Sequence, residues 1–240
     1  VIVGGGLIGV ELAEMLSTRN IHVTFLVREK HFWNNVLPDE EAQLLERHIY
    51  EHHIDLRLET NLEEIITDDN GKAKSVKIKE TGEVLDCDLV GLTPGVSPNV
   101  EFLKSSSIEL NRGVLVNRML ETSEPDVYAI GDCAEQREPI GNRPPIEAVW
   151  YTGRMMGETL AQTLCGNPME YKPGHWFNSA KFFDIEYQTY GWVFNTPKEG
   201  QNDFYWEHED GKKCIHIHYE KESRIFKGIN TFGIRLRHEV

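Results

Sequence analysis

The sequence predicts an α/β fold that begins with a Rossmann-like strand, turn and helix and ends in a small antiparallel β-rich domain of the α+β type. Three observations carry this prediction. A GxGxxG turn at residues 4–9 stands between an apolar run and a helical pattern. A second apolar run follows at residues 22–27, close enough to complete a βαβ unit. Beyond residue 171, runs rich in aromatic and β-branched residues alternate with turn signals.

The composition narrows the class of protein. The 240 residues include 25 Lys and Arg against 39 Asp and Glu, which gives a net charge of -14. Such a chain repels phosphate backbones and anionic lipid surfaces, so we expect no nucleic-acid partner. The sequence has no run of 18 apolar residues and no signal-peptide pattern, so we also expect no membrane span and a cytoplasmic location.

The first elements follow from hydrophobic periodicity. Residues 1–3 form a β-type run, and apolar residues at helical spacing continue from Leu7 to Leu16. The run at residues 22–27 then predicts a second strand parallel to the first. A second helix begins after Pro38, because three acidic residues precede an apolar periodic face, as the helix dipole favours.

The middle of the chain alternates short strands with turns and loops. Strands are expected at residues 55–58, 73–79 and 88–92, and the first domain closes near Thr93. Residues 96–145 read as loop-rich. Two short strands are expected within them, at 114–116 and 127–130. A helix is then predicted from Ala148 to Leu164, ended by Gly166-Asn167-Pro168.

Five strands are predicted in the C-terminal segment, at residues 177–183, 187–194, 204–209, 214–219 and 225–232. Within the fourth, Cys214, His216 and His218 alternate with apolar residues and share one face. We interpret them as the polar face of a half-exposed strand and expect no metal site. His48, His52 and His53 are similarly expected to form a solvated helix end.

The glycine turn has the context of a dinucleotide-binding site. Gly4 would allow the tight turn, Gly6 would let a pyrophosphate approach the backbone, and Gly9 would let helix and strand pack closely. The anion would then lie at the helix N-terminus, beside Leu7 and Ile8. The alternative is a tight strand-to-helix turn that binds nothing.

The residues after the second strand bear on the choice of coenzyme. Arg28 could meet the 2′-phosphate of NADP(H), whereas Glu29 could accept hydrogen bonds from the ribose hydroxyls of NAD(H). An exposed arginine after a strand can also be a plain surface residue. We favour NADP(H).

A second motif gives a family resemblance. Residues 122–132, TSEPDVYAIGD, closely resemble a late segment of the pyridine nucleotide-disulphide oxidoreductases, two-dinucleotide flavoproteins. Residues 4–14 resemble the start of their NAD(P)H domain, and residues 92–95 their return to the FAD domain. The resemblance implies that Asp132, after Gly131, binds the ribityl chain of FAD and that Gly95 lies at the hinge.

The resemblance also implies roles for two helix starts. Glu11 would lie beside the nicotinamide and pair with a lysine of the FAD domain, although its position is equally that of an exposed helix carboxylate. The backbone of Ala148 and Val149 would point towards the flavin, as a helix N-terminus suits an anionic reduced flavin. Trp150 would shield the flavin ring or, alternatively, pack in the core.

The resemblance divides the chain into three domains: NAD(P)H-binding residues 1–93, FAD-domain residues 94–170, and β-rich residues 171–240. The first GxGxxG and the cysteine pair of the family are absent, so we expect a truncated chain whose strand at 127–130 exposes apolar surface. The four cysteines show no CxxC pair, which argues against a disulfide framework or a zinc site. Cys133 is expected to be a buried spectator.

The predicted function is FAD-dependent NAD(P)H oxidation, with hydride passing from a nicotinamide dinucleotide to flavin and then to an unknown acceptor, such as an electron-acceptor protein or domain. Two alternatives remain open. One is a non-catalytic NAD(P)H-responsive scaffold or sensor similar to apoptosis-inducing factor, and the other is a free-standing NAD(P)-binding module. In each case the β-rich domain is compatible with a homodimer or partner interface.

Overall fold

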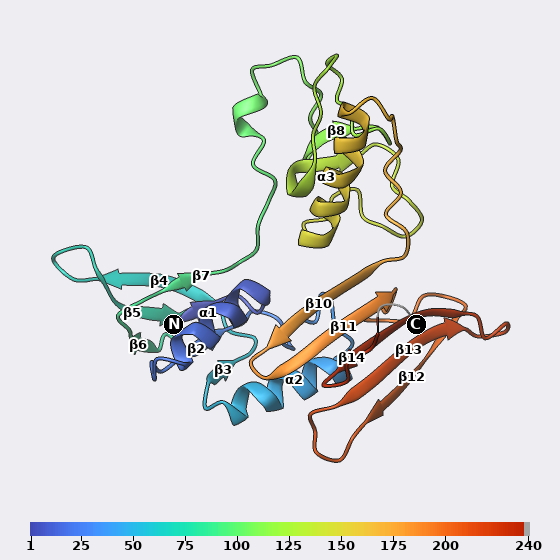
Figure 1. The fold of residues 1–240 in the computed structure, drawn as a ribbon. Coiled ribbons are helices and arrows are strands. Elements are labelled where there is room, and N and C mark those ends of the chain that lie inside the picture. The colour runs from blue at the N-terminus through green and yellow to red at the C-terminus, as the bar shows by residue number, and fades with distance from the viewer. Residues whose placement is uncertain (238–240) are drawn as a thin grey trace. The chain divides into compact units, whose positions relative to one another are not determined.

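The computed structural model describes residues 1–237, which form two compact units. Of the described residues, unit 1 combines 1–95 with 179–237, and unit 2 comprises 96–178 (Figure 1). The β-rich C-terminal segment therefore belongs by its contacts to the same compact unit as the N-terminal segment. The functional boundaries after residues 93 and 170 stay a prediction.

Unit 1 contains a four-stranded sheet in the order β3-β2-β1-β7. Its strands are β1 (Ile2–Val3), β2 (Thr24–Leu26), β3 (Asp55–Arg57) and β7 (Gly91–Leu92). All three neighbouring pairs are parallel, which confirms the α/β prediction and the βαβ unit. Each strand is shorter than the apolar run that predicted it, because only the residues in the hydrogen-bonded ladder count as strand.

Two helices connect strands of this sheet: α1 lies between β1 and β2 in the chain, and α2 between β2 and β3. Helix α1 (Leu7–Ser17) buries Gly9, Val10 and Ala13, and α2 (Asp39–Glu51) begins directly after Pro38, as predicted. The first turn of α2 holds Asp39, Glu40 and Glu41. Only Glu41 of these is buried, so α2 carries one carboxylate into the interior.

A three-stranded antiparallel sheet, β4-β5-β6, is inserted between β3 and β7. Its strands are β4 (Leu62–Thr67), β5 (Ala73–Ile78) and β6 (Val84–Asp86). The sequence predicted only β5. It missed β4 because exposed Glu63 and Glu64 interrupt its apolar pattern, and β6 because only one of its three residues is half-buried.

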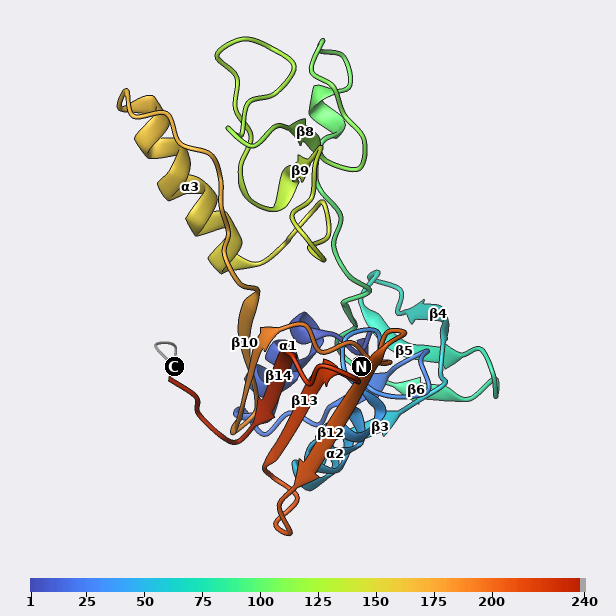
Figure 2. The same cartoon turned by 90° about the vertical axis from the view of Figure 1, so that its right-hand side faces the viewer.

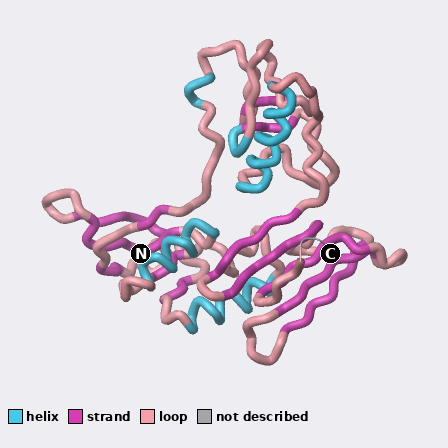
Figure 3. The backbone as a smooth tube through the Cα atoms, viewed as in Figure 1, coloured by secondary structure: helices cyan, strands magenta, loops and turns pink. Residues whose placement is uncertain are grey.

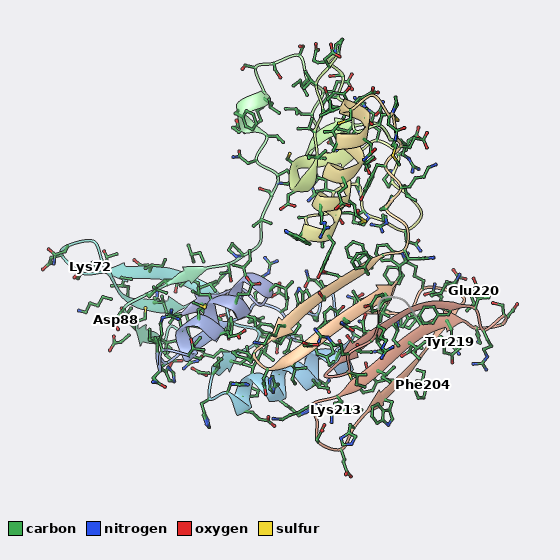
Figure 4. All side chains as sticks on the ribbon, in the orientation of Figure 1. Lys72, Asp88, Phe204, Lys213, Tyr219 and Glu220 are labelled. Atoms are coloured by element: carbon green, nitrogen blue, oxygen red, sulfur yellow. The ribbon has the colours of Figure 1, made fainter. Side chains whose placement is uncertain are left out.

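The C-terminal sheet has five strands in the order β10-β11-β14-β13-β12. Figure 2 shows β14, β13 and β12 side by side in this sheet. They are β10 (Phe177–Phe182), β11 (Ile185–Gly191), β12 (Gln201–Glu207), β13 (Cys214–Glu220) and β14 (Phe226–Phe232). β14 pairs antiparallel with β11 and β13, and β12 with β13. All five predicted strands are confirmed. Phe204 on the edge strand β12 is 54% exposed (Figure 4).

The larger hydrophobic cluster of unit 1 joins its N-terminal and C-terminal segments. Phe25 of the parallel sheet and Leu45 of α2 belong to the same buried cluster as Phe182 and Phe232 of the C-terminal sheet. Phe182, Tyr187 and Phe232 also lie with ring centroids 4.9–6.2 Å apart. The β-rich segment is therefore held to the N-terminal segment by shared apolar burial, which is the dominant favourable term in folding.

Two expectations about histidines are wrong. Cys214, His216 and His218 are at most 1% exposed, so the polar face of β13 is its buried face. His48 is also buried, at 2% exposure, and is not part of a solvated helix end. For His216 and His48 the physical reason is the same: a carboxylate from a distant segment, Glu41 or Asp184 respectively, reaches the imidazole and offsets its desolvation.

Unit 2 is mostly loop (Figure 3). It contains the parallel pair β8 (Val114–Val116) and β9 (Ala134–Gln136), helix α3 (Trp150–Leu164) and the short 3₁₀ turns η1 (Glu101–Leu103) and η2 (Gly131–Cys133). β8 and α3 were predicted, although α3 begins two residues later than expected.

The predicted strand at residues 127–130 is wrong. Only Tyr128 makes a β-bridge there, to Glu121, and Asp126 before it has a positive φ of 63°. Val127 and Ile130 are 38% and 37% exposed, as expected for apolar residues without a neighbouring strand. A short apolar run without a partner strand stays irregular because its backbone groups have no ladder to join.

Candidate functional site

The glycine turn between β1 and α1 is fixed by backbone contacts. Gly4 has φ +118°, a left-handed conformation that side chains rarely adopt, and a Cβ there would lie 2.3 Å from the Thr93 carbonyl oxygen. The Gly4 amide donates to the Leu26 carbonyl at 3.0 Å. The first glycine therefore closes the turn against the two neighbouring strands.

Gly9 explains how closely the helix approaches the sheet. A Cβ at Gly9 would lie 2.8 Å from the Gly4 carbonyl oxygen and 3.1 Å from the Phe25 ring. Real side chains do not reach such distances, so any larger residue would push α1 away from β1 and β2. The third glycine is thus required by packing.

Gly6 differs from the other two. Its backbone, at φ −114° and ψ −179°, is open to any residue, and no atom lies within 4 Å of a Cβ built there. Nothing in the described residues requires glycine at this position. An approaching ligand is the remaining physical reason to keep it small.

The same position is the N-cap of α1. No side chain caps the helix, and its first turn contains no acidic residue. The first backbone N–H groups of a helix have no intrahelical partner and carry a partial positive charge. This uncapped end beside an open glycine has the chemistry of an anion site.

Thr93 is a residue that sequence reasoning named only as a boundary. Its amide and hydroxyl both donate to the Val3 carbonyl, at 2.8 and 3.0 Å. Its carbonyl closes the space beside Gly4. Thr93 thus holds the end of β7 against the glycine turn. The sequence signal that could have identified this role is a hydroxyl residue at the end of a predicted strand. Gly95 follows two residues later with φ +109°.

Arg28 and Glu29 follow β2, where the coenzyme ribose was expected. The Arg28 Nε donates to Glu29 Oε1 at 2.7 Å, and the two side chains are 75% and 35% exposed. The hydrogen bond and charge of Glu29 raise the pKa of Arg28. The two residues weighed as alternatives therefore bind each other, and either ribose ligand has to compete with this pair.

Glu11 lies on α1, one turn beyond the glycine turn, and is exposed. Its neighbour Glu14 instead pairs with Lys181 at 3.0 Å. The position leaves the Glu11 carboxylate accessible. Its role at a nicotinamide stays a prediction.

In unit 2, Gly131 and Asp132 form the turn η2. Gly131 has φ +75°, and its amide donates to the Met156 sulfur of α3 at 3.3 Å. A Cβ at Gly153 would lie 3.5 Å from the Gly131 Cα, an ordinary van der Waals distance, so α3 packs directly against the turn. The helix therefore holds the turn while the Asp132 side chain stays exposed.

The start of α3 is a second uncapped helix end. Val149 is its N-cap without a side-chain hydrogen bond, no acidic residue lies in the first turn, and Ala148 before it is exposed. Trp150 is 66% exposed, which overturns the alternative that it packs in the core. The Arg154 guanidinium lies 5.6 Å from its ring centroid.

A buried ion pair anchors the segment that leads into α3. Arg143 Nη1 donates to both oxygens of Glu147, at 2.7 and 3.0 Å, and the side chains are 6% and 4% exposed. Arg143 Nη2 also donates to the Pro173 and Gly174 carbonyls. Burial raises the pKa of Glu147, and Arg143 opposes that rise. This pair was missed, although an i, i+4 Arg and Glu were visible in the sequence.

The four cysteines form no disulfide bond among the described residues. All four are free thiols, and Cys133, which was expected to be a buried spectator, is only half-buried. Its Sγ lies 3.6 Å from the Ile130 carbonyl. The 3₁₀ turn η2 places it beside exposed Asp132, which limits how deeply it can sit.

The structure thus gathers the predicted residues into two groups. Unit 1 brings together the turn, the α1 N-terminus, Glu11 and the pair after β2. Unit 2 brings together the turn η2 and the start of α3. Each group combines an exposed carboxylate with an uncapped helix N-terminus.

Comparison with known proteins gives a family match over most of the chain. The model of the family described as "Pyridine nucleotide-disulphide oxidoreductase" matches residues 1–157. The 5,5'-dehydrodivanillate O-demethylase ferredoxin reductase subunit of Sphingobium sp. is 33% identical over 192 residues, covering 79% of this chain and 46% of that protein. The rubredoxin-NAD(+) reductase of Acinetobacter baylyi is 31% identical over 161 residues, covering 67% and 40%.

A solved structure supports the fold. The ferredoxin reductase for the CYP199A2 system from Rhodopseudomonas palustris matches with a TM-score of 0.83 and 21% identity, over 97% of this chain and 55% of that one. The chain therefore spans less than two thirds of the relatives and the structure it matches. The scaffold alternative gains no support from these relatives, which are all named as reductases.

One further observation concerns membranes. Among residues 1–237, no helix combines the length and the apolar character needed to cross a bilayer.

Proposed function

The chain belongs to the pyridine nucleotide-disulphide oxidoreductase family, and from this premise we propose that it is the nicotinamide-binding and part of the flavin-binding portion of an NAD(P)H-dependent flavoprotein oxidoreductase. Hydride would pass from NAD(P)H to FAD and then to an electron acceptor. The observation that carries the proposal is Gly6, whose open surroundings beside an uncapped helix end fit a pyrophosphate.

The residues of unit 1 fit a dinucleotide. The helix end supplies free N–H donors from Leu7 and Ile8, and Gly6 leaves room for phosphate oxygens to approach them. Arg28 or Glu29, after β2, would bind the adenosine ribose or its 2′-phosphate. Glu11 is proposed to orient the nicotinamide, because it is an exposed carboxylate on the same helix.

The residues of unit 2 fit a flavin. Asp132 offers exposed carboxylate oxygens that can accept from ribityl hydroxyls, and Gly131 and Met156 hold its turn in place. The uncapped start of α3, at Ala148 and Val149, offers N–H donors to a flavin carbonyl. FAD, when bound, supplies the electron-accepting chemistry.

The protein's own contribution is positioning and electrostatics. A helix N-terminus stabilises negative charge that develops near it, so the α3 N-terminus would favour a reduced, anionic ring. Trp150, exposed at that helix start, is proposed to cover the ring from solvent.

We extend the proposal to the acceptor, a small redox protein of the ferredoxin or rubredoxin kind. The named functions of the two relatives support this subclass. The net charge of -14 opposes it for acidic carriers, unless other residues of the whole protein supply a basic patch. Slower reduction of an acidic carrier at low salt than at high salt would reveal that repulsion.

The test is reduction of the FAD-loaded protein by NADH or NADPH without oxygen, followed by flavin absorbance. Rapid loss of the oxidised-flavin band and repeated turnover with a dye acceptor are expected. A slow, long-lived reduced complex without turnover would instead support the scaffold. Asp132→Asn should weaken FAD retention at least tenfold, whereas Glu138→Gln, another exposed carboxylate of unit 2, should leave it unchanged.

A further inference from the structure

Three metal-ligating side chains meet at the C-terminal end of α2. His48 lies in the last turn of the helix and His52 is its C-cap residue. Asp184 lies in the turn between β10 and β11 and is 132 residues away from His52 in the sequence. Among the described residues, this is a group whose three ligand atoms lie within 4.8 Å of one another.

The ligand atoms point at one another. His48 Nε2 is 2.6 Å and His52 Nε2 is 3.0 Å from Asp184 Oδ1, and the two Nε2 atoms are 3.2 Å apart. A tetrahedral zinc ion with ligands at roughly 2.0–2.2 Å holds those ligands about 3.3 Å apart. The observed triangle needs only a small expansion, and Asp184, 66% exposed at a turn, is free to supply it.

The two imidazoles are held in place by their surroundings. Residues four apart on a helix lie on the same face, which brings the two rings together. The His52 ring stacks on the Phe183 ring at 4.5 Å and 19°. Phe183 itself has φ +56°, so the turn that places Asp184 also places this ring.

The surroundings of His48 Nδ1, the ring nitrogen that faces away from Asp184, are those of a metal-binding histidine. His48 Nδ1 is buried without a hydrogen-bond partner, and its nearest carboxylate oxygen is Glu51 Oε2 at 3.7 Å. A carboxylate on that side favours the proton on Nδ1 and leaves the Nε2 lone pair for a cation. Glu51 is in turn paired with Lys212 at 3.1 Å.

We propose that His48, His52 and Asp184 bind a first-row divalent cation of the zinc type, which clasps the end of α2 to the β10–β11 turn. Two imidazole nitrogens and one carboxylate oxygen suit such an ion better than Mg²⁺ or Ca²⁺, which prefer oxygen ligands. His52 and Asp184 are 34% and 66% exposed, so the ion can enter and a water can take the fourth position. The site is independent of coenzyme binding.

The role follows from what the three ligands join. Helix α2 comes from the N-terminal segment of unit 1 and the turn from its C-terminal sheet. An ion that binds only when these two segments are docked stabilises the docked state by mass action. Cation binding would therefore raise the stability of unit 1.

The experiment is calorimetric titration of the EDTA-treated chain with ZnCl₂. A Cys165→Ser background removes the exposed thiol, because a cysteine thiolate is itself a zinc ligand. One equivalent of zinc should bind, and His52→Ala and Asp184→Asn should each weaken binding at least tenfold. These two exposed positions carry the test because replacement of buried His48 is more disruptive. His53→Asn is the matched control: His53 is exposed, adjacent and left-handed, a conformation that asparagine tolerates.

A second measurement makes the outcome independent of the heat signal. Zinc should raise the Tm of the parent chain and of His53→Asn, but not that of His52→Ala. Absence of binding, or equal binding by all the variants, would overturn the proposal and identify the cluster as hydrogen-bonded imidazoles with adventitious zinc only. Loss of coenzyme binding leaves this result unaffected, so the two proposals fail separately.

Discussion

Glu41 of α2 and His216 of β13 form an ion pair in the interior of unit 1, with 3.2 Å between Glu41 Oε1 and His216 Nδ1 and side chains 0% and 2% exposed. His216 Nε2 contacts Asp203 Oδ2 at 3.0 Å on its other side. Both Glu41 oxygens also accept from the Asn230 amide, at 3.1 and 2.9 Å. This network joins the helix to the C-terminal sheet.

The network predicts a pH-dependent stability. Burial lowers the pKa of His216, but Glu41 and Asp203 outweigh it, so the pKa is raised above its usual 6.5. A raised histidine pKa contributes stability that is complete below the unfolded value and is lost as pH rises through the folded value. Burial also raises the pKa of Glu41, which acts in the same direction.

His216→Gln should therefore destabilise unit 1 by about 3 kcal/mol at pH 6 and by clearly less at pH 9. At pH 6 the substitution removes a charged imidazolium from a buried ion pair, whereas at pH 9 the imidazole of the parent chain is already neutral and the ion pair no longer exists. Urea unfolding at both pH values measures the difference. Burial lowers the pKa of the neighbouring His218, and comparison with the parent chain at each pH cancels the contribution of that histidine to the pH dependence. Exposed His22→Gln is the control. A deficit that is equal at both pH values would contradict the charged pair.

Arg143 and Glu147 predict a similar effect in unit 2. Arg143→Met leaves the Glu147 carboxylate buried without its cation, and we expect a loss of about 3–5 kcal/mol. Because burial raises the pKa of Glu147, the variant should recover part of that loss as the pH falls and the carboxyl group takes a proton. Unfolding followed by tryptophan fluorescence at pH 8 and pH 5 checks this.

The control for that variant is Arg154→Met. Arg154 pairs with Glu158 at the same i, i+4 spacing, but the side chains are 61% and 62% exposed. An exposed pair of this kind is worth at most about 1 kcal/mol. Equal losses in the two variants would show that the Arg143 pair is not effectively buried.

Local patterns in the sequence were enough to predict much of this fold. The glycine turn, α2 and the strands of the C-terminal sheet depend on residues close in sequence, so periodicity and turn chemistry revealed them. The site positions at Gly4 and Gly9 were assigned from spacing, and the contacts around them agree with those mechanical roles.

Long-range pairing could not be predicted in the same way. His216 was interpreted as a surface residue because its carboxylate partner, Glu41, lies on a distant helix, and Asn230 meets Glu41 across 189 residues. His48 was misjudged for the same reason, since Asp184 comes from another segment. The strand at residues 127–130 failed because an apolar run says nothing about whether a neighbouring strand exists.

The contrast between Gly6 and Gly9 gives a direct test of the coenzyme site. Gly9→Val pushes a side chain against the Gly4 carbonyl and should destabilise unit 1 by about 1–3 kcal/mol. At Gly6 no atom lies within 4 Å of a built Cβ, so Gly6→Val should cost less than about 1 kcal/mol, mainly through poorer helix capping. It should nevertheless abolish NADH and NADPH binding. Thermal unfolding and fluorescence titration separate the two effects, and unimpaired binding by Gly6→Val would refute the assigned pyrophosphate position.

Coenzyme choice depends on the pair after β2. Arg28→Ala should weaken NADPH binding about tenfold, since it removes a charge-assisted hydrogen bond to the 2′-phosphate that Arg28 can make only in competition with its pairing to Glu29. NADH binding should stay the same or improve, because Glu29 is released from Arg28. Glu29→Gln should have the opposite preference, weakening NADH more than NADPH.

Lys30→Ala is the matched control for Arg28→Ala, because Lys30 is an exposed cation two residues along and removes the same net charge. If both variants weaken NADPH equally, the effect is long-range electrostatics and will fade as salt shortens the Debye length to about 8 Å at 0.15 M. A selective effect of Arg28 that survives salt requires direct contact, since a contact between oppositely charged groups is screened much less than a distant one. That outcome would assign the 2′-phosphate to Arg28 and make NADPH the coenzyme of this chain.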